Sequence, residues 1–130
     1  MEVEIFTICD YCQDNHGKMI VIGPFDTIFA REFPATHPVL GIAGRIVFEP
    51  EEEKGSDIKI LVLDPDGKDL LRPILGKFDL KDDESKPLKH LNICITNTNV
   101  LFKKPGKHLF QLFLGDKMLR QISINLTERK

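Results

Sequence analysis

The chain has 130 residues, 42% of them hydrophobic, and a formal net charge of -2 at pH 7. This length fits one domain over residues 1–130, which on folding hides roughly two thirds of the surface of its extended chain. The charge gives no electrostatic attraction to nucleic-acid phosphates, and no apolar run approaches the roughly 18 residues that suggest a membrane span. We therefore expect neither a nucleic-acid partner nor a membrane partner.

The N-terminus and the cysteines favour the cytoplasm. Glu2 and Glu4 stand where a secretory signal would carry positive charge. The three cysteines are an odd number, which cannot complete a disulfide framework. We expect a protein of a reducing compartment.

The first third of the chain predicts strands separated by turns. Residues 1–22 are typical of a hairpin, since the Asn and Gly of the Asp14–Gly17 stretch tolerate positive φ. Pro24 cannot donate to a ladder, so the strand is expected to bend there before it continues to Ala30. Two prolines then favour an extended connection, followed by a strand over residues 39–49.

The middle of the chain carries a clear hairpin signal. A strand-like run, an Asp-Pro-Asp-Gly turn and a second run occupy residues 57–71. The acidic run at residues 49–57 has no apolar stripe and is interpreted as a solvated loop. Residues 72–80 give no clear pattern, and residues 81–87 are polar and typical of a turn.

The last third alternates in the manner of strands with one buried face. Within residues 88–102, isoleucine and leucine alternate with polar residues. The final hairpin, residues 106–126, has Gly115-Asp116 as its two-residue turn. We expect Met118 on its core face and Leu119 on the opposite face.

These elements predict an all-β chain without a helix. About seven to nine short strands in one antiparallel domain favour a β-sandwich. A closed β-barrel is the alternative architecture.

The cysteines raise the question of a metal or redox site. Cys9 and Cys12 form a CxxC pattern, with His16 and Cys94 as further ligand types for zinc. Residues three apart in a strand point to opposite faces, so one ion could join the pair only if the strand breaks. A thioredoxin-type site would need a helix after the motif. The favoured interpretation is packing thiols, and a metal-binding domain remains an alternative.

Three aspartates around one turn resemble part of a calcium loop. Asp64, Asp66 and Asp69 supply hard oxygen ligands near a glycine. With Asp64 at the first position of such a loop, the twelfth position holds Leu75 in place of the needed glutamate. Turn chemistry alone accounts for these residues. We predict no metal and no cofactor.

No catalytic residue can be nominated from the sequence. The four histidines lie on different predicted elements, without a neighbouring nucleophile and carboxylate. Arg45 is the one charge inside an apolar strand and must reach solvent or pair with a carboxylate such as Asp10 or Asp26. A small hydrolase or ligand-binding enzyme built around such a polar cluster is an alternative hypothesis.

The leading hypothesis is a non-enzymatic binding or assembly module. Leu109 and Phe113 lie opposite the predicted core face of their strand. Large exposed apolar patches usually mark contacts with other molecules. The two residues therefore predict an interface, with either a second copy of the chain or another protein as partner.

Several short segments carry a resemblance to a known family. Glu4–Tyr11, Gly17-Lys18 and Ile22–Ile28 resemble the start of a family of small uncharacterised bacterial proteins. The similarity continues through Phe33-Pro34, His37-Pro38, the turn at residues 63–67 and Pro105-Gly106. The resemblance implies a compact single-domain β-sandwich. It implies no activity, cofactor or site residue.

Overall fold

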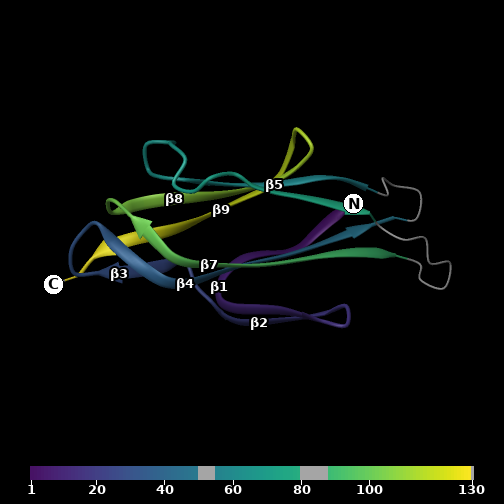
Figure 1. The fold of residues 1–130 in the computed structure, drawn as a ribbon, viewed down its shortest axis with the longest axis horizontal. Helices are drawn as coiled ribbons and strands as arrows, with labels where there is room; N and C mark the ends of the chain where they lie inside the picture. Colours follow the sequence, from purple (N-terminus) through teal and green to yellow (C-terminus); the bar gives the residue numbers. More distant parts are fainter. Residues whose placement is uncertain (50–54, 80–87, 130) are drawn as a thin grey trace.

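The computed structural model describes residues 1–49, 55–79 and 88–129. In that part of the chain it contains nine β-strands and no helix, arranged as two packed sheets (Figure 1). The first sheet contains, in spatial order, β2 (Lys18–Pro24), β1 (Glu2–Asn15), β4 (Ala35–Phe48) and β7 (Lys89–Phe102). The second contains β3 (Thr27–Ala30), β9 (Lys117–Glu128), β8 (Gly106–Leu114), β5 (Gly55–Leu63) and β6 (Ile74–Asp79).

The predicted β-sandwich is confirmed. All neighbouring strands pair antiparallel except β3, which runs parallel to β9. The strand order resembles that of an immunoglobulin-type sandwich. In the first sheet, β4 and β7 are neighbours, as strands B and E are in that fold. In the second sheet, β5, β8 and β9 correspond to strands C, F and G.

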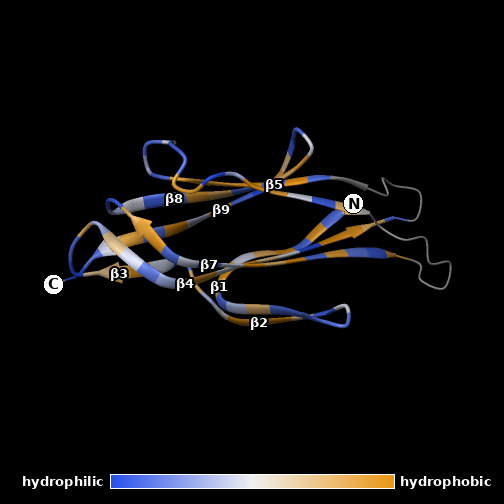
Figure 2. Ribbon diagram, viewed as in Figure 1, coloured by the Kyte–Doolittle hydropathy of each residue, from blue (hydrophilic) through white to orange (hydrophobic). Residues whose placement is uncertain are grey.

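The core lies between the two sheets because alternate residues of each strand point inward. On β4 the inward side chains include Leu40, Ile42, Ile46 and Phe48, each at most 1% exposed. Figure 2 shows hydrophobic and hydrophilic residues alternating along several strands. Burial of this kind contributes about 25 cal/mol for each Å² of apolar surface removed from water.

Strand β1 takes part in two layers. Its first half, up to Cys9, pairs with β4, and its second half pairs with β2. Figure 1 shows the β1–β2 hairpin turning back beneath the first sheet. Residues 10–24, here called the flap, therefore cover part of the outer face of that sheet. The flap ends in a two-residue turn in which His16 and Gly17 have φ values of 52 and 86.

The central hairpin differs from the expectation. The run at residues 69–71 forms only an isolated bridge between Leu63 and Asp69, and the partner strand of β5 is β6, in the segment without a clear pattern. Asp64 explains this, because its carbonyl and carboxylate accept hydrogen bonds within the turn and extend it. Of the predicted acidic loop, residues 50–54 lie outside the described residues, whereas residues 55–57 belong to β5, so the loop prediction was wrong there. The polar stretch at residues 81–87 lies outside the described residues.

The last hairpin has the predicted turn but a different register. Gly115 has a positive φ of 57 between β8 and β9. A register shift between Leu112 and Phe113 places Met118 opposite Phe113. Met118 is consequently 48% exposed and Leu119 packs against the core, so the expected facing of these two residues was wrong.

His108 is a polar side chain inside the core. It is 0% exposed, and its ring meets the edge of the Phe102 ring at a centroid distance of 5.1 Å. Nδ1 donates a hydrogen bond to the Gly106 carbonyl, while Nε2 has no hydrogen-bond partner among the described residues. Burial lowers the pKa of His108 below 6.5. The charge of Lys104 also lowers this pKa, whereas the hydrogen bond to the Gly106 carbonyl and the charge of Asp64 partly oppose the shift. The ring is therefore neutral in the folded protein at neutral pH.

This burial predicts a stability that falls on acidification. Below about pH 6.5 the unfolded chain protonates His108 and the folded chain does not, so the free energy of unfolding decreases as pH falls. Urea unfolding between pH 7.5 and 5 should show a shallower pH dependence for His108→Leu than for the wild type. His16→Asn, at an exposed turn position with positive φ, is the control and should keep the wild-type slope. An unchanged slope for His108→Leu would contradict this account.

Candidate functional site

The flap packs on the first sheet through a small second core. Cys9, Cys12 and Ala43 are buried together, with Met19 and Val21 partly buried against them. The sheet has no side chain at Gly41, where the bend of β1 approaches its backbone closely. A Cβ added at Gly41 would lie 3.0 Å from the Cys9 Sγ and 3.2 Å from the Cys9 carbonyl oxygen. A glycine at this position is what allows the flap to approach so closely.

The bend of β1 overturns the argument that Cys9 and Cys12 must diverge. Both side chains enter the second core, and Cys94 of β7, the strand on the other side of β4, interacts with Cys12. Burial, followed by the proximity of Cys12, raises the pKa of Cys9 to about 12. Desolvation and the same neighbour raise the pKa of Cys94 to about 11. All three cysteines are free thiols, and Cys9 and Cys94 are protonated at neutral pH.

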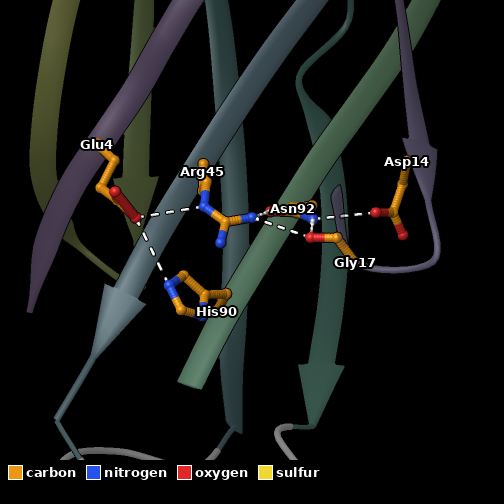
Figure 3. Close-up of polar contacts among 6 residues, drawn as sticks. All are labelled: Glu4, Asp14, Gly17, Arg45, His90 and Asn92. Carbon is orange, nitrogen blue, oxygen red and sulfur yellow. Dashed lines mark hydrogen bonds and ion pairs between the residues drawn. The ribbon is translucent and has the colours of Figure 1, made fainter. Parts of the chain in front are cut away.

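Arg45 holds the flap at its other end (Figure 3). Its Nε donates to the Glu4 Oε1 at 3.2 Å. Its Nη1 donates to the Asn92 Oδ1 at 2.8 Å and to the Gly17 carbonyl in the flap turn at 3.2 Å. The guanidinium thus joins β1, β4 and β7 to the turn of the flap.

Asn92 completes this polar cluster. Its Nδ2 donates to the Asp14 Oδ1 at 3.0 Å and to the Gly17 carbonyl at 3.1 Å. On the far side, His90 Nε2 lies 3.7 Å from the Glu4 Oε1. The cluster comprises Glu4, Asp14, Gly17, Arg45, His90 and Asn92. Because its central donors are already engaged, it serves first to fasten the flap.

The structure gives Arg45 other partners than the two aspartates suggested by the sequence. Asp10 lies beside Gly23 on the flap, since a Cβ added at Gly23 would be 2.5 Å from the Asp10 Oδ2. Asp26 accepts a hydrogen bond from the Thr27 hydroxyl. Sequence reasoning missed Glu4 and Asn92, although the alternation of β7 already placed Asn92 on the outer face.

The other residues considered for metal binding lie in turns, where most of them take part in local contacts. Asp64 Oδ1 accepts the amide N–H groups of Asp66 and Lys68, each at 2.9 Å, and Asp66 forms an ion pair with Lys104. Asp69 belongs to the isolated bridge, and His16 is exposed in the flap turn. Across residues 1–49, 55–79 and 88–129, no three His, Cys, Asp or Glu side chains converge in a way that could hold a metal ion.

The outer face of the second sheet carries apolar side chains. Leu109 and Phe113 lie there, half-buried, on the side of β8 opposite the buried Phe110 and Leu112. Lys59 Nζ stands 4.6 Å from the centre of the Phe113 ring. We call this surface the outer apolar face and define it by Leu61, Leu63, Leu109, Phe113 and Met118.

A groove opens between the two sheets at the edge formed by β6 and β7. Its volume is about 300 Å³. Ile58, Ile60 and Ile74 line it from the second sheet, and Leu91, Ile93 and Ile95 line it from β7. We call it the edge groove. It is an apolar concavity at the side of the sandwich.

Comparison with solved structures finds distant likenesses to parts of two larger proteins. A β-glucosidase from Listeria innocua in complex with glucose matches 97% of this chain and 15% of its own chain, with 9% identity and a TM-score of 0.52. The Pseudomonas fluorescens alkylpurine DNA glycosylase AlkC, bound to DNA containing an abasic site analogue, matches 97% of this chain and 30% of its own, with 11% identity and a TM-score of 0.49. The chain thus spans under a third of either protein. The first likeness concerns the fold alone.

No curated protein matches this chain. In the part of the chain that the structure covers, no helix has the length and apolarity needed to cross a membrane. A family model matches residues 4–127, nearly the whole sequence. The chain belongs to that family, a family of unknown function designated DUF6941.

Proposed function

We propose that this protein is a non-enzymatic assembly module that associates through its outer apolar face, with a second copy of the chain as partner. The observation that carries the proposal is the position of Leu109 and Phe113 on the solvent side of β8. The solvated face of an antiparallel sheet is normally polar. Leucine and phenylalanine at those positions instead suit a surface that is covered by another protein.

The chemistry of the described residues supports a binding role over a catalytic one. Arg45, the residue that best suited an enzyme hypothesis, is used to fasten the flap. The raised pKa values of Cys9 and Cys94 make both thiols poor nucleophiles at neutral pH. The odd number of cysteines supports a reducing cytoplasm as the setting.

Light scattering of untagged protein at several concentrations, with a reducing agent present, tests the assembly. The wild type should be a dimer, and Leu109→Asp or Phe113→Asp should weaken dimerisation at least tenfold, because each places a charge in the apolar contact. Met118→Asp, at a residue that is 48% exposed, provides a variant that need not disturb folding. Ile22→Asp, on the 54% exposed flap position, is the matched control and should leave the mass unchanged.

Two results would overturn the proposal. One is a wild-type mass that stays monomeric at every concentration. The other is a dimer that survives both Phe113→Asp and Met118→Asp while circular dichroism shows the native fold.

The polar cluster is expected to act on stability and flap closure. Asn92→Ala removes one of the three acceptors of Arg45 and a donor to the flap turn, and should cost about 1–3 kcal/mol of unfolding free energy. Amide hydrogen exchange should accelerate most in residues 12–21 of the flap. Thr96→Ala, an exposed position on the same strand, is the control. Equal acceleration throughout the sandwich would contradict a local fastening role.

The thiols are expected to resist alkylation. At pH 7.5, Cys94 should react with iodoacetamide more than tenfold more slowly than free cysteine, and its rate should rise with pH toward about 11. Buried Cys9 and Cys12 should react more slowly still. Peptide mass spectrometry measures each site, with urea-unfolded protein as the control. Cys94 labelling as fast as free cysteine would restore the hypothesis of a reactive thiol.

A further inference from the structure

Four strands form the sheet edges, and three of them are short. In strand order, the outermost strands are β2 and β7 in the first sheet and β3 and β6 in the second. β3 has 4 residues, β6 has 6 and includes Lys77, and β2 has 7 and ends at Pro24. Short length, lysine and proline are the features by which proteins protect an edge from pairing.

β7 lacks these protections beyond its first residue, Lys89. It has 14 residues and pairs with β4 along one side. Between Leu91 and Phe102 it contains no charged residue, no proline and no glycine. Among the described residues, no strand pairs with its other side. The backbone N–H and C=O groups along that side suit a further strand.

The edge groove lies directly beside this strand. Of the residues that line it, Lys77 is the one with a charge. β7 contributes Leu91, Ile93 and Ile95, which are every second residue of the strand. A strand added to β7 would also point every second side chain toward the same groove.

Gly76 creates much of this opening. It stands opposite Ile58, whose side chain is buried toward the core, so a side chain at position 76 would point the same way. A Cβ built at Gly76 meets no heavy atom within 4 Å, and its φ is not in the left-handed region. Neither backbone conformation nor close packing requires a glycine here. Its effect is to leave apolar space at the open side of the sandwich.

We propose that the free edge of β7 and the edge groove bind an extended, uncharged polypeptide segment that carries apolar side chains at every second position. The backbone edge selects a polypeptide over a small apolar molecule, because only an extended chain offers matching donors and acceptors along several residues. The uncharged stretch from Leu91 to Phe102 and the apolar groove select against charged side chains. This binding is independent of the assembly through the outer apolar face.

Peptide selection from a random library of linear dodecamers displayed on phage tests the proposal, with immobilised wild-type protein as the target. Enriched sequences should be uncharged with apolar residues at alternate positions. Synthetic versions of the enriched peptides should slow amide hydrogen exchange along β7.

A graded series at Gly76 provides the matched variants. Gly76→Ala should lower the affinity for the synthetic peptides slightly. Gly76→Leu should lower it at least tenfold, because its side chain fills the groove, while thermal unfolding shows an intact fold. Phe113→Asp, which acts on the outer apolar face, should bind the peptides like the wild type. Failure of the assembly proposal therefore leaves this test unaffected.

Four outcomes would overturn the inference. The selection yields no enriched peptides, or the enriched peptides bind Gly76→Leu as tightly as the wild type, or they bind without protecting β7 amides from exchange. A wild-type dimer that Gly76→Leu dissociates and Phe113→Asp does not would likewise overturn it, and would assign the edge to a second copy of the chain.

Discussion

Strand β4 is the element on which the rest of the structure depends, because it is packed on both of its faces. Its inward residues, from Leu40 to Phe48, form the middle of the sandwich core. Its outward residues Gly41 and Ala43 are small enough to admit the flap, and Arg45 then fastens the flap turn. A larger side chain at position 41 would separate the flap from the sheet even if the sandwich itself remained folded.

The two faces of the molecule consequently differ in character. The outer face of the first sheet is partly covered by the chain's own flap and by hydrogen bonds that satisfy its charged groups. The outer face of the second sheet carries the half-buried side chains of Leu109 and Phe113. This difference between the two sheets is the basis on which we propose association through the second sheet.

Local patterns made much of the fold predictable. Alternation identified β7, and glycine-containing turns located the β1–β2 and β8–β9 hairpins, because both signals depend on residues close in sequence. The fold-back of β1 was not predictable, since its two halves alternate alike and differ only in their partners, β4 and β2. The register shift that exchanged Met118 and Leu119 depends on pairing across the hairpin. The partners of Arg45 were hidden for a similar reason, since Glu4 and Asn92 lie 41 and 47 positions away.

The parallel pairing of β3 with β9 has a mechanical consequence. β9 is the last strand, and the backbone N–H of Arg129 also donates to the Ala30 carbonyl at the end of β3. If the two termini are pulled apart, the force enters the fold at β1. Once β1 and β2 have separated from the first sheet, it reaches β3 at its first residue and leaves β9 at its last. In parallel strands these points lie at opposite ends of the ladder, so its hydrogen bonds are loaded together in shear and do not open one at a time. The shortest strand of the sandwich is thus paired in a geometry that resists stretching after the strands before it have separated.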